Sequence, residues 1–276
     1  MLATGCVAAL AVAASSAGAA VTIGQTGPPS GLCNPNQDWA QQLVSSGTPY
    51  IVPSIPPATS LSIISWSHQA DATPNEQLKL KVYRPVSGLT YNVVGQDLRS
   101  LTPSALNTFQ VSIPVAPGDI LGLTSPPSTP AVGCGTGAFG ETDLESFSDG
   151  GLGENVTFFT TAAKRLNVSA VVEPTNTFTL GAVTRNTKKG TATLAVGVPN
   201  PGDLTATGSG VQASRATEAK SVLSAGTVAL VIKATGKKLK KLRRKGKVTV
   251  ALSIAYTPTN GSATTQSTQV TLKKKK

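Results

Sequence analysis

Short runs of alternating hydrophobic and polar residues, separated by turn residues, recur along the whole chain. In the segment 77–84 (QLKLKVYR), Leu78, Leu80 and Val82 fall on one face of an extended strand. The two lysines between them share the opposite face with Tyr83. The composition supports this pattern, because threonine and valine favour strands while glycine and proline favour turns. The sequence therefore predicts an all-β protein.

The N-terminal part, residues 21–173, is expected to form a jelly-roll-like β-sandwich. Its predicted strands are short, and no helical periodicity extends beyond a few turns. They cover 61–67, 77–84, 89–96, 108–115, 119–124, 155–161 and 165–174. One helical candidate interrupts them at 36–44, where Trp39, Leu43 and Val44 would form an apolar stripe.

The C-terminal part, residues 174–276, is expected to form an Ig-like Greek-key β-sandwich. Strand patterns follow one another closely here, and TNGS at 259–262 is typical of a tight hairpin. Between two of the strands lies GKKLKKLRRKGK, with Leu239 and Leu242 three residues apart. This spacing predicts a short amphipathic connector helix near 237–245, with Gly246 at its end.

Charge divides the chain at the same place. Residues 1–173 carry six basic and eleven acidic groups, whereas residues 174–276 carry eighteen basic and two acidic groups. The connector concentrates this charge, and the lysines at 273–276 add a basic tail. Two readings stay open: the connector is only a solvated cap, or it also binds a polyanion. The candidate polyanion-binding residues are Lys237, Lys238, Lys240, Lys241, Arg243, Arg244 and Lys245.

The N-terminal twenty residues resemble a secretory signal peptide, although no lysine or arginine precedes Lys79 and the usual basic first part is missing. An apolar run at 6–14 precedes the small residues SSAGAA, which fit a cleavage site after residue 19 or 20. The remaining chain has two cysteines, Cys33 and Cys134, and no second run long enough to cross a membrane. In an exported protein an even cysteine count predicts one disulfide, and we expect an extracellular or cell-envelope location.

Few residues suggest chemistry. His68 is the single histidine and has no nucleophile nearby in sequence, so a structural role is expected. The acidic segment 141–154 contains Glu141, Asp143 and Asp149, which could supply oxygen ligands to calcium. A solvated loop is the simpler interpretation, and no other cofactor is expected. The same carboxylates are the candidates for a glycan hydrolase, which needs a pair across a cleft.

Aromatic residues could form a sugar-binding platform. Tyr83 and Trp66 are the candidate contacts, although a chain with few aromatics also needs them in its core. Nucleic acid is not an expected partner, because no aromatic residue lies among the lysines of the basic segments.

Four motifs carry a resemblance to a known type of module. KKGTATL (188–194), PNPGDL (199–204), KKLKK (237–241) and YTPTNG (256–261), with the lysine-rich end, resemble a C-terminal Ig-like module of uncharacterised secreted proteins from high-GC soil actinobacteria. The resemblance covers residues 176–276. It implies an accessory sandwich of an exported bacterial protein, and it implies no catalytic residues.

Together these patterns predict a non-enzymatic, exported binding or adhesion protein. Its expected partner is an anionic cell-wall polymer or a glycan. A secreted glycan-acting enzyme and a purely structural surface or matrix protein are the alternatives. The sequence alone does not identify the ligand or the oligomeric state.

Overall fold

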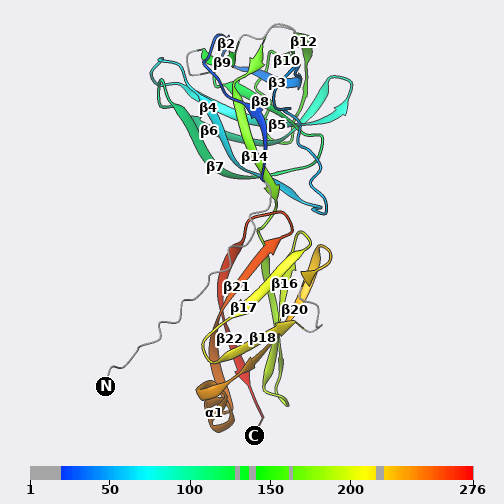
Figure 1. Cartoon of the computed structure of the whole chain (residues 1–276), viewed down its shortest axis with the longest axis vertical. Helices are drawn as coiled ribbons and strands as arrows, with labels where there is room; N and C mark the ends of the chain where they lie inside the picture. The colour runs from blue at the N-terminus through cyan, green and yellow to red at the C-terminus, as the bar shows by residue number, and fades with distance from the viewer. Residues whose placement is uncertain (1–19, 128–130, 137–140, 162–163, 216–220, 276) are drawn as a thin grey trace, which may run out of the picture.

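The chain is all-β, as the sequence predicts. The structure, a computed structural model, describes residues 20–127, 131–136, 141–161, 164–215 and 221–275. The predicted signal peptide lies outside this range except for Ala20. All ladders between the described strands are antiparallel, and α1 (Gly236–Lys245) is the one helix in the described part of the chain. Two units, residues 21–174 and 176–275, follow one another along the long axis of the molecule (Figure 1).

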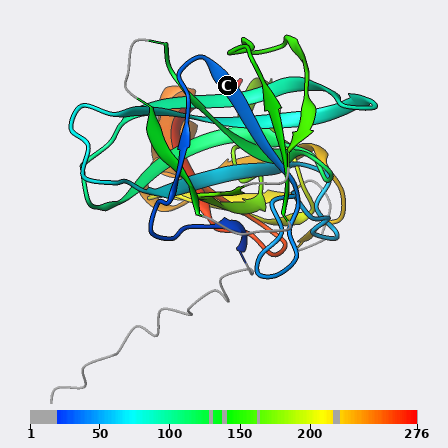
Figure 2. The same cartoon turned by 90° about the horizontal axis from the view of Figure 1, so that it is seen from above.

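The N-terminal unit holds three sheets. A four-stranded sheet has the order β1 (Val21–Gln25), β14 (Val168–Pro174), β4 (Leu61–Gln69), β7 (Leu106–Val115). A seven-stranded sheet has the order β11 (Asn155–Thr157), β6 (Thr90–Ser100), β5 (Gln77–Ser87), β8 (Ile120–Ser125), β3 (Gln37–Leu43), β10 (Thr142–Ser146), β12 (Phe159–Thr161). A small sheet has the order β13 (Arg165–Leu166), β9 (Val132–Thr136), β2 (Gly31–Cys33). The long strands run side by side across the unit (Figure 2).

The central strands of the seven-stranded sheet, β5, β8 and β3, are buried on both faces over most of their length. One face carries Leu80 and Leu123, which pack against Ile63 and Val172 of the four-stranded sheet. The opposite face carries a second apolar cluster around Tyr83, covered by the segment 147–158. The alternation in β5 is therefore a division between two cores and not between core and solvent.

The helix predicted for 36–44 is wrong, because this segment is strand β3. Asp38 pairs with Thr124 of β8, and Leu144 of β10 pairs with Ala40 on the other side. Ladder bonds on both sides outweigh the local helical tendency of alanine, glutamine and leucine. Trp39 consequently enters the core between the sheets, whereas Leu43 is exposed.

The predicted disulfide is confirmed. Cys33 on β2 and Cys134 on β9 are bonded, and both are fully buried in the main core. The bond closes a loop with a sequence separation of 101 residues. In the chain-entropy account a closure of this length stabilises the fold by about 4–5 kcal/mol.

The C-terminal unit is a Greek-key sandwich with the strand order of an immunoglobulin constant-type fold and one additional two-residue strand at an edge. One sheet has the order β15 (Thr179–Asn186), β16 (Thr191–Val198), β20 (Gly226–Ala234), β18 (Val211–Arg215). The other has the order β19 (Ser221–Val222), β17 (Gly202–Thr207), β21 (Lys247–Pro258), β22 (Thr264–Lys273). Alternate residues of β16 and β21 fill a core of its own, centred on Leu194, Val250 and Tyr256.

Asn200 joins the two units. Its buried side chain accepts hydrogen bonds from the backbone N–H groups of Thr59 and Ser60 at 2.8 and 2.9 Å. It also donates to the carbonyls of Ser60 and Thr175 at 2.8 and 2.9 Å. Tyr256 holds the backbone of Asn200 in place by donating its hydroxyl to the Asn200 carbonyl at 2.8 Å. Because the amide is fully hydrogen-bonded, its burial at the joint carries little desolvation penalty.

His68 is a buried structural histidine. Its Nδ1 lies 2.7 Å from the carbonyl oxygen of Asn167, which requires the proton on Nδ1. Burial lowers the pKa of His68 from 6.5 to about 4, although the hydrogen bond to Asn167 opposes the shift. The imidazole is therefore neutral in the folded protein at neutral pH.

We expect His68 to make the protein acid-sensitive. The unfolded chain binds a proton below pH 6.5, whereas the folded chain does so only near pH 4. The contribution of neutral His68 to the free energy of unfolding is therefore complete above pH 6.5. It falls by about 3 kcal/mol as the pH drops to 4. Urea unfolding of the wild type and of His68→Asn, whose amide can donate the same hydrogen bond, measures the difference.

Glu76 has the opposite effect on stability. Burial raises its pKa from 4.5 to about 7, so this residue stabilises the folded protein as the pH falls. This contribution is common to both proteins and cancels in the comparison. Parallel stability curves for the wild type and His68→Asn between pH 7 and 4 would contradict the prediction.

Candidate functional site

The helix α1 forms where the sequence places an amphipathic connector. It begins at Gly236 after Thr235 and ends at Gly246, which has a left-handed backbone (φ 70°) and donates its N–H to the carbonyl of Leu242 at 2.8 Å. Glycine adopts this conformation without steric cost. The last turn carries Arg243, Arg244 and Lys245, whose charges are favourable at the negative end of the helix dipole.

Leucines attach this helix to the C-terminal core. Leu242 is 1% exposed, and Leu239 packs against the same core from a half-buried position. Leu242 also reaches the hairpin between β15 and β16, since a Cβ atom on Gly190 would lie 3.2 Å from its Cδ2. The leucines therefore turn the opposite side of the helix, with its cations, towards solvent.

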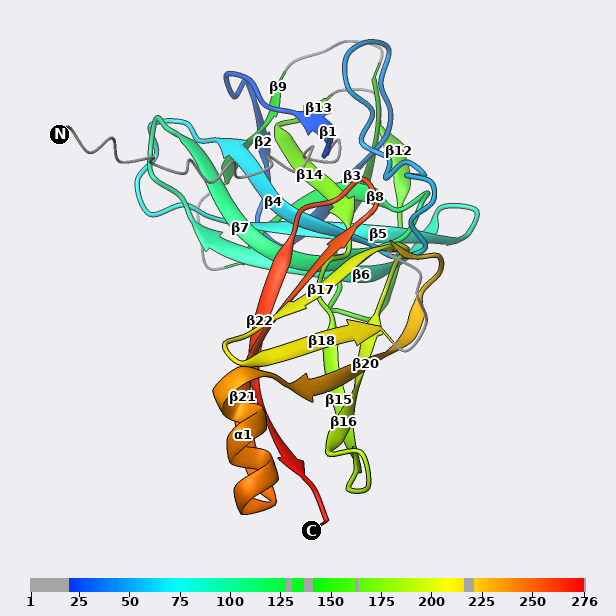
Figure 3. The same cartoon turned by 60° about the horizontal axis from the view of Figure 1, so that its bottom comes forward.

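Four segments bring their cations to this end of the molecule. They are the β15–β16 hairpin, α1, the start of β21 and the C-terminal segment. The backbone N–H of Lys274 donates to Gly246 at 2.8 Å, and that of Lys275 donates to Thr187 at 2.9 Å. These bonds place the C-terminal segment between α1 and the β15–β16 hairpin, farthest from the N-terminal unit (Figure 3). We call this surface the basic end. It comprises Lys188, Lys189, Lys237, Lys238, Lys240, Lys241, Arg243, Arg244, Lys245, Lys247, Lys273, Lys274 and Lys275.

No acidic group of the described residues forms an ion pair with the cations of the basic end. All ion pairs between described residues lie in the N-terminal unit, between Asp38 and Arg165 in the chain. Within α1, pairs such as Lys237–Lys241 and Lys240–Arg244 place like charges four residues apart. Each such pair destabilises a helix by about 0.2–0.5 kcal/mol. The basic end therefore accumulates repulsion that an anionic ligand would relieve.

The structure adds residues to the predicted set and changes the role of one. Lys188 and Lys189 join the basic end from the hairpin, through a contact between segments that are distant in sequence. In the sequence, the only feature that could have indicated their role is the pair of lysines directly before Gly190. Lys238 is half-buried, and its ammonium donates to the carbonyl of Thr249 at 3.2 Å. It therefore attaches α1 to β21, while Lys237, Lys240 and Lys241 are exposed.

The acidic residues proposed for calcium or for hydrolysis are held separately. Glu141 is fully buried, receives a hydrogen bond from the Ser45 hydroxyl at 2.7 Å and forms an ion pair with Arg165. Burial would raise its pKa, but these contacts outweigh that effect and lower it. Asp143 is buried on β10. Among the described residues, no three histidine, cysteine or acidic side chains form a group able to hold a metal.

Asp149 contacts lysines. Its carboxylate lies 2.6 Å from the ammonium groups of both Lys79 and Lys81. Burial alone would raise its pKa, but the hydrogen bonds and charges of the two lysines lower it. At neutral pH Glu141 and Asp149 are both ionised, so neither stores a proton in the way a glycosidase acid must.

The predicted sugar contacts are corrected by burial. Tyr83 and Trp66 are both fully buried. The segment 147–158 covers the face of β5 that carries Tyr83, and Trp66 of β4 lies in the main core. Trp66 donates its indole N–H to Asp97 at 2.7 Å. An aromatic pair that the sequence did not single out is exposed instead. Phe147 and Phe159 are 72% and 37% exposed, with ring centroids 5.0 Å apart.

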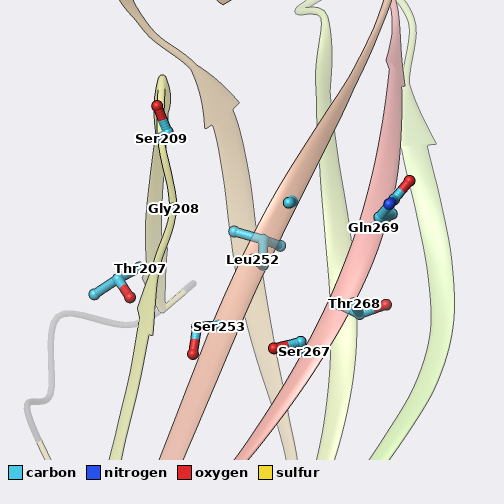
Figure 4. A pocket seen from close by; sticks show the side chains of 9 residues that line it. Thr207, Gly208, Ser209, Leu252, Ser253, Ser267, Thr268 and Gln269 are labelled. Atoms are coloured by element: carbon cyan, nitrogen blue, oxygen red, sulfur yellow. The ribbon is translucent and has the colours of Figure 1, made fainter.

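A hollow of about 450 Å³ lies on the C-terminal unit beside the turn between β17 and β18. Its lining is uncharged and mixes hydroxyl-bearing side chains with the apolar side chain of Leu252 (Figure 4). The residues are Thr207, Gly208, Ser209, Ala251, Leu252, Ser253, Ser267, Thr268 and Gln269. None of these side chains is charged, so the hollow offers hydroxyl and amide hydrogen bonds but no acid–base group.

No protein-family model, curated protein or solved structure matches the chain. Within the described residues, no helix has the length and apolar character needed to cross a membrane. Function is therefore inferred from the geometry and charge of the chain itself.

We expect Leu242→Ala to loosen the basic end. Truncating a buried leucine leaves a cavity, so the free energy of unfolding should fall by about 2–5 kcal/mol. Far-UV circular dichroism in urea reports the loss, while fluorescence reports the N-terminal unit, which holds both tryptophans. Lys241→Ala, on the exposed side of the helix, is the control. Equal stability of the two variants would show that Leu242 does not anchor α1.

Proposed function

We propose that the protein is an exported, non-enzymatic binding protein of the cell envelope or its surroundings, and that its basic end holds an anionic cell-wall polymer. The observation that carries the proposal is the convergence of cations from four segments at one end of the C-terminal unit, where no described acidic residue pairs with them. A flexible polyanion can contact such an end at several points at once. Multivalent attraction of this kind is strong at low ionic strength and screened by salt.

The disulfide supports the location. A buried cystine such as Cys33–Cys134 forms and persists in oxidising compartments. The apolar segment at 6–14 is a second observation that supports export. The resemblance of residues 176–276 to modules of secreted actinobacterial proteins agrees with a location at or outside a bacterial cell envelope.

A wall polymer suits the basic end better than a nucleic acid. The aromatics of residues 174–276 are Phe178 and Tyr256, and both are buried in the core. The basic end therefore has no ring on which a base could stack, which single-strand binders use. Charge attraction alone suits a repeating phosphodiester or carboxylate polymer.

Cosedimentation with purified bacterial walls tests the proposal. The walls are used before and after removal of their anionic polymers, at low and at high salt. We expect wild-type binding to intact walls to fall on the order of tenfold or more at high salt, and the salt-sensitive part of the binding to be lost on stripped walls. Lys240→Gln with Lys241→Gln should weaken binding, because two exposed charges are removed.

Two matched variants separate local from overall charge. Lys240→Arg with Lys241→Arg keeps the charge and should bind like the wild type. Ala263→Glu with Thr265→Glu changes the net charge by the same amount as the glutamine pair, at exposed positions near the joint, and should bind more strongly than that pair. Binding to intact walls that is unaffected by salt or by the glutamine pair would refute the proposed function.

The exposed Phe147–Phe159 pair favours a second candidate, which is neutral glycan binding by the N-terminal unit. The pair lies at the β12 edge of the seven-stranded sheet, and its rings are tilted by 38°. Exposed rings stack on the apolar faces of sugars, and isolated large apolar side chains on a surface need no such explanation. The proximity of the two rings is what favours a ligand.

Stripped walls at high salt test this candidate separately. We expect residual wild-type binding under these conditions, and its loss in Phe147→Ser with Phe159→Ser. Leu152→Ser is the control, because Leu152 is 62% exposed but lies outside the ring pair. The absence of residual wild-type binding, or equal binding by both variants, would exclude the ring pair as a glycan site.

A further inference from the structure

Lys81 is a fully buried lysine that touches two carboxylates. It lies on β5, on the face of the seven-stranded sheet covered by the segment 147–158. Its Nζ lies 2.6 Å from Asp38 Oδ1 and 2.6 Å from Asp149 Oδ1. It also donates to the carbonyl of Gly150 at 2.6 Å. The amine thus meets a carboxyl group in a site from which bulk water is excluded.

Asp38 is held in one orientation by hydrogen bonds to both of its carboxylate oxygens. Its carboxylate is fully buried, and the Thr124 hydroxyl donates a hydrogen bond to Oδ1. The backbone N–H of Gly150 donates to Oδ2 at 3.0 Å. Glycine is required there, because a Cβ atom would lie 2.3 Å from the Val156 side chain. One oxygen is therefore placed beside the nucleophile and the other beside a fixed amide donor.

We propose that Lys81 and Asp38 condense to form an intramolecular amide bond, with Asp149 as the proton carrier. Proximity and exclusion of water are the two conditions that favour such a condensation. A lysine amine is a competent nucleophile once it has lost its proton.

The atoms balance with one water released. The ammonium passes one proton to Asp38 Oδ1, which leaves a neutral amine and a carboxylic acid. The amine attacks the carboxyl carbon, and the charge that develops on Oδ2 is stabilised by the Gly150 N–H. Asp149 accepts the second proton from Nζ and returns it to Oδ1. The C–Oδ1 bond breaks, water leaves, and a secondary amide remains.

Condensation also removes two buried charges. An ion pair in a protein interior pays a desolvation penalty that only good geometry repays. After the reaction Asp149 and Lys79 remain as a balanced pair at 2.6 Å. The product amide keeps acceptor and donor groups for Gly150, so the polar atoms of the site stay paired.

The bond would tie together two strands that do not pair directly. β3 and β5 lie on opposite sides of β8, and both run antiparallel to it. Asp38 and Lys79 are both in register with Thr124 of β8. An amide from Asp38 to Lys81 would therefore clamp β8 between two covalently joined neighbours.

Mass spectrometry of the purified, reduced and denatured protein tests the proposal directly. We expect the wild type to be lighter than its sequence by one water, about 18 Da. Tryptic digestion should leave the bond after Lys81 uncut and yield a branched peptide joining Asp38 to Lys81. The measurement is made at once and after prolonged incubation of the folded protein, so that a slow reaction is also observed.

Variants assign the roles. Lys81→Arg keeps the charge but lacks the nucleophilic amine, and Asp38→Ala lacks the acceptor, so both should retain the full mass. Lys79→Arg is the matched control, because Lys79 lies on the same face and contacts Asp149, yet the cross-link should persist. Asp149→Asn should slow or abolish the reaction. Asp38→Asn should release ammonia, about 17 Da, and reach the same product as the wild type.

The wild-type measurement decides even where a variant does not fold. A full-length mass with normal cleavage after Lys81, at both times, would leave only a buried ion pair and overturn the proposal. A cross-link mapped to Lys79 and Asp149 would overturn the assignment of the residues. Neither result depends on whether the basic end binds a polymer.

Discussion

The burial of the Lys81 ammonium is the constraint on which the N-terminal unit depends. A charge removed from water is tolerated only where opposite charges and hydrogen bonds replace the solvent. Asp38 of β3 and the neighbouring residues Asp149 and Gly150 of the segment 147–158 supply these contacts. The segment 147–158 must therefore fold over the sheet in one position, and it brings Phe158 and Val156 to close the second core. Removing one partner alone would leave an unpaired buried charge, which typically costs about 3–5 kcal/mol.

The joint between the units also depends on a buried polar group whose hydrogen bonds replace the solvent. This group is the side-chain amide of Asn200. Asn200 is buried, and both its oxygen and its nitrogen are hydrogen-bonded to backbone groups of the N-terminal unit or the link that follows it. Ser262 adds a second contact, donating its hydroxyl to Glu173 at 3.1 Å. Such directional bonds fix an orientation that apolar packing alone leaves less defined. They keep the basic end at the far side of the C-terminal unit from the acidic N-terminal unit.

The sequence predicts what is local and misses what is brought together by folding. The leucine spacing in 239–242 suffices for α1, because a short amphipathic helix is read from neighbouring positions. The alternation in β5 places Leu80 and Val82 in the core, but it cannot show that a distant segment covers Lys81 and Tyr83. Strand β3 was predicted as a helix for the same reason, since its partners β8 and β10 lie far along the chain. Lys188 and Lys189 likewise join the basic end only through tertiary hydrogen bonds.

The placement of the basic end has a mechanical consequence under the proposed function. β21 begins at Lys247 beside α1 and runs to the joint, where Tyr256 bonds to Asn200. A pull on a polymer held by α1 would therefore pass along one strand, flanked by β17 and β22, into the residues that precede β4. The N-terminal unit receives that pull with Cys33 and Cys134 already bonded across its small sheet. A covalent tie between β3 and β5 would join two strands of the seven-stranded sheet that are otherwise connected through the ladders of β8.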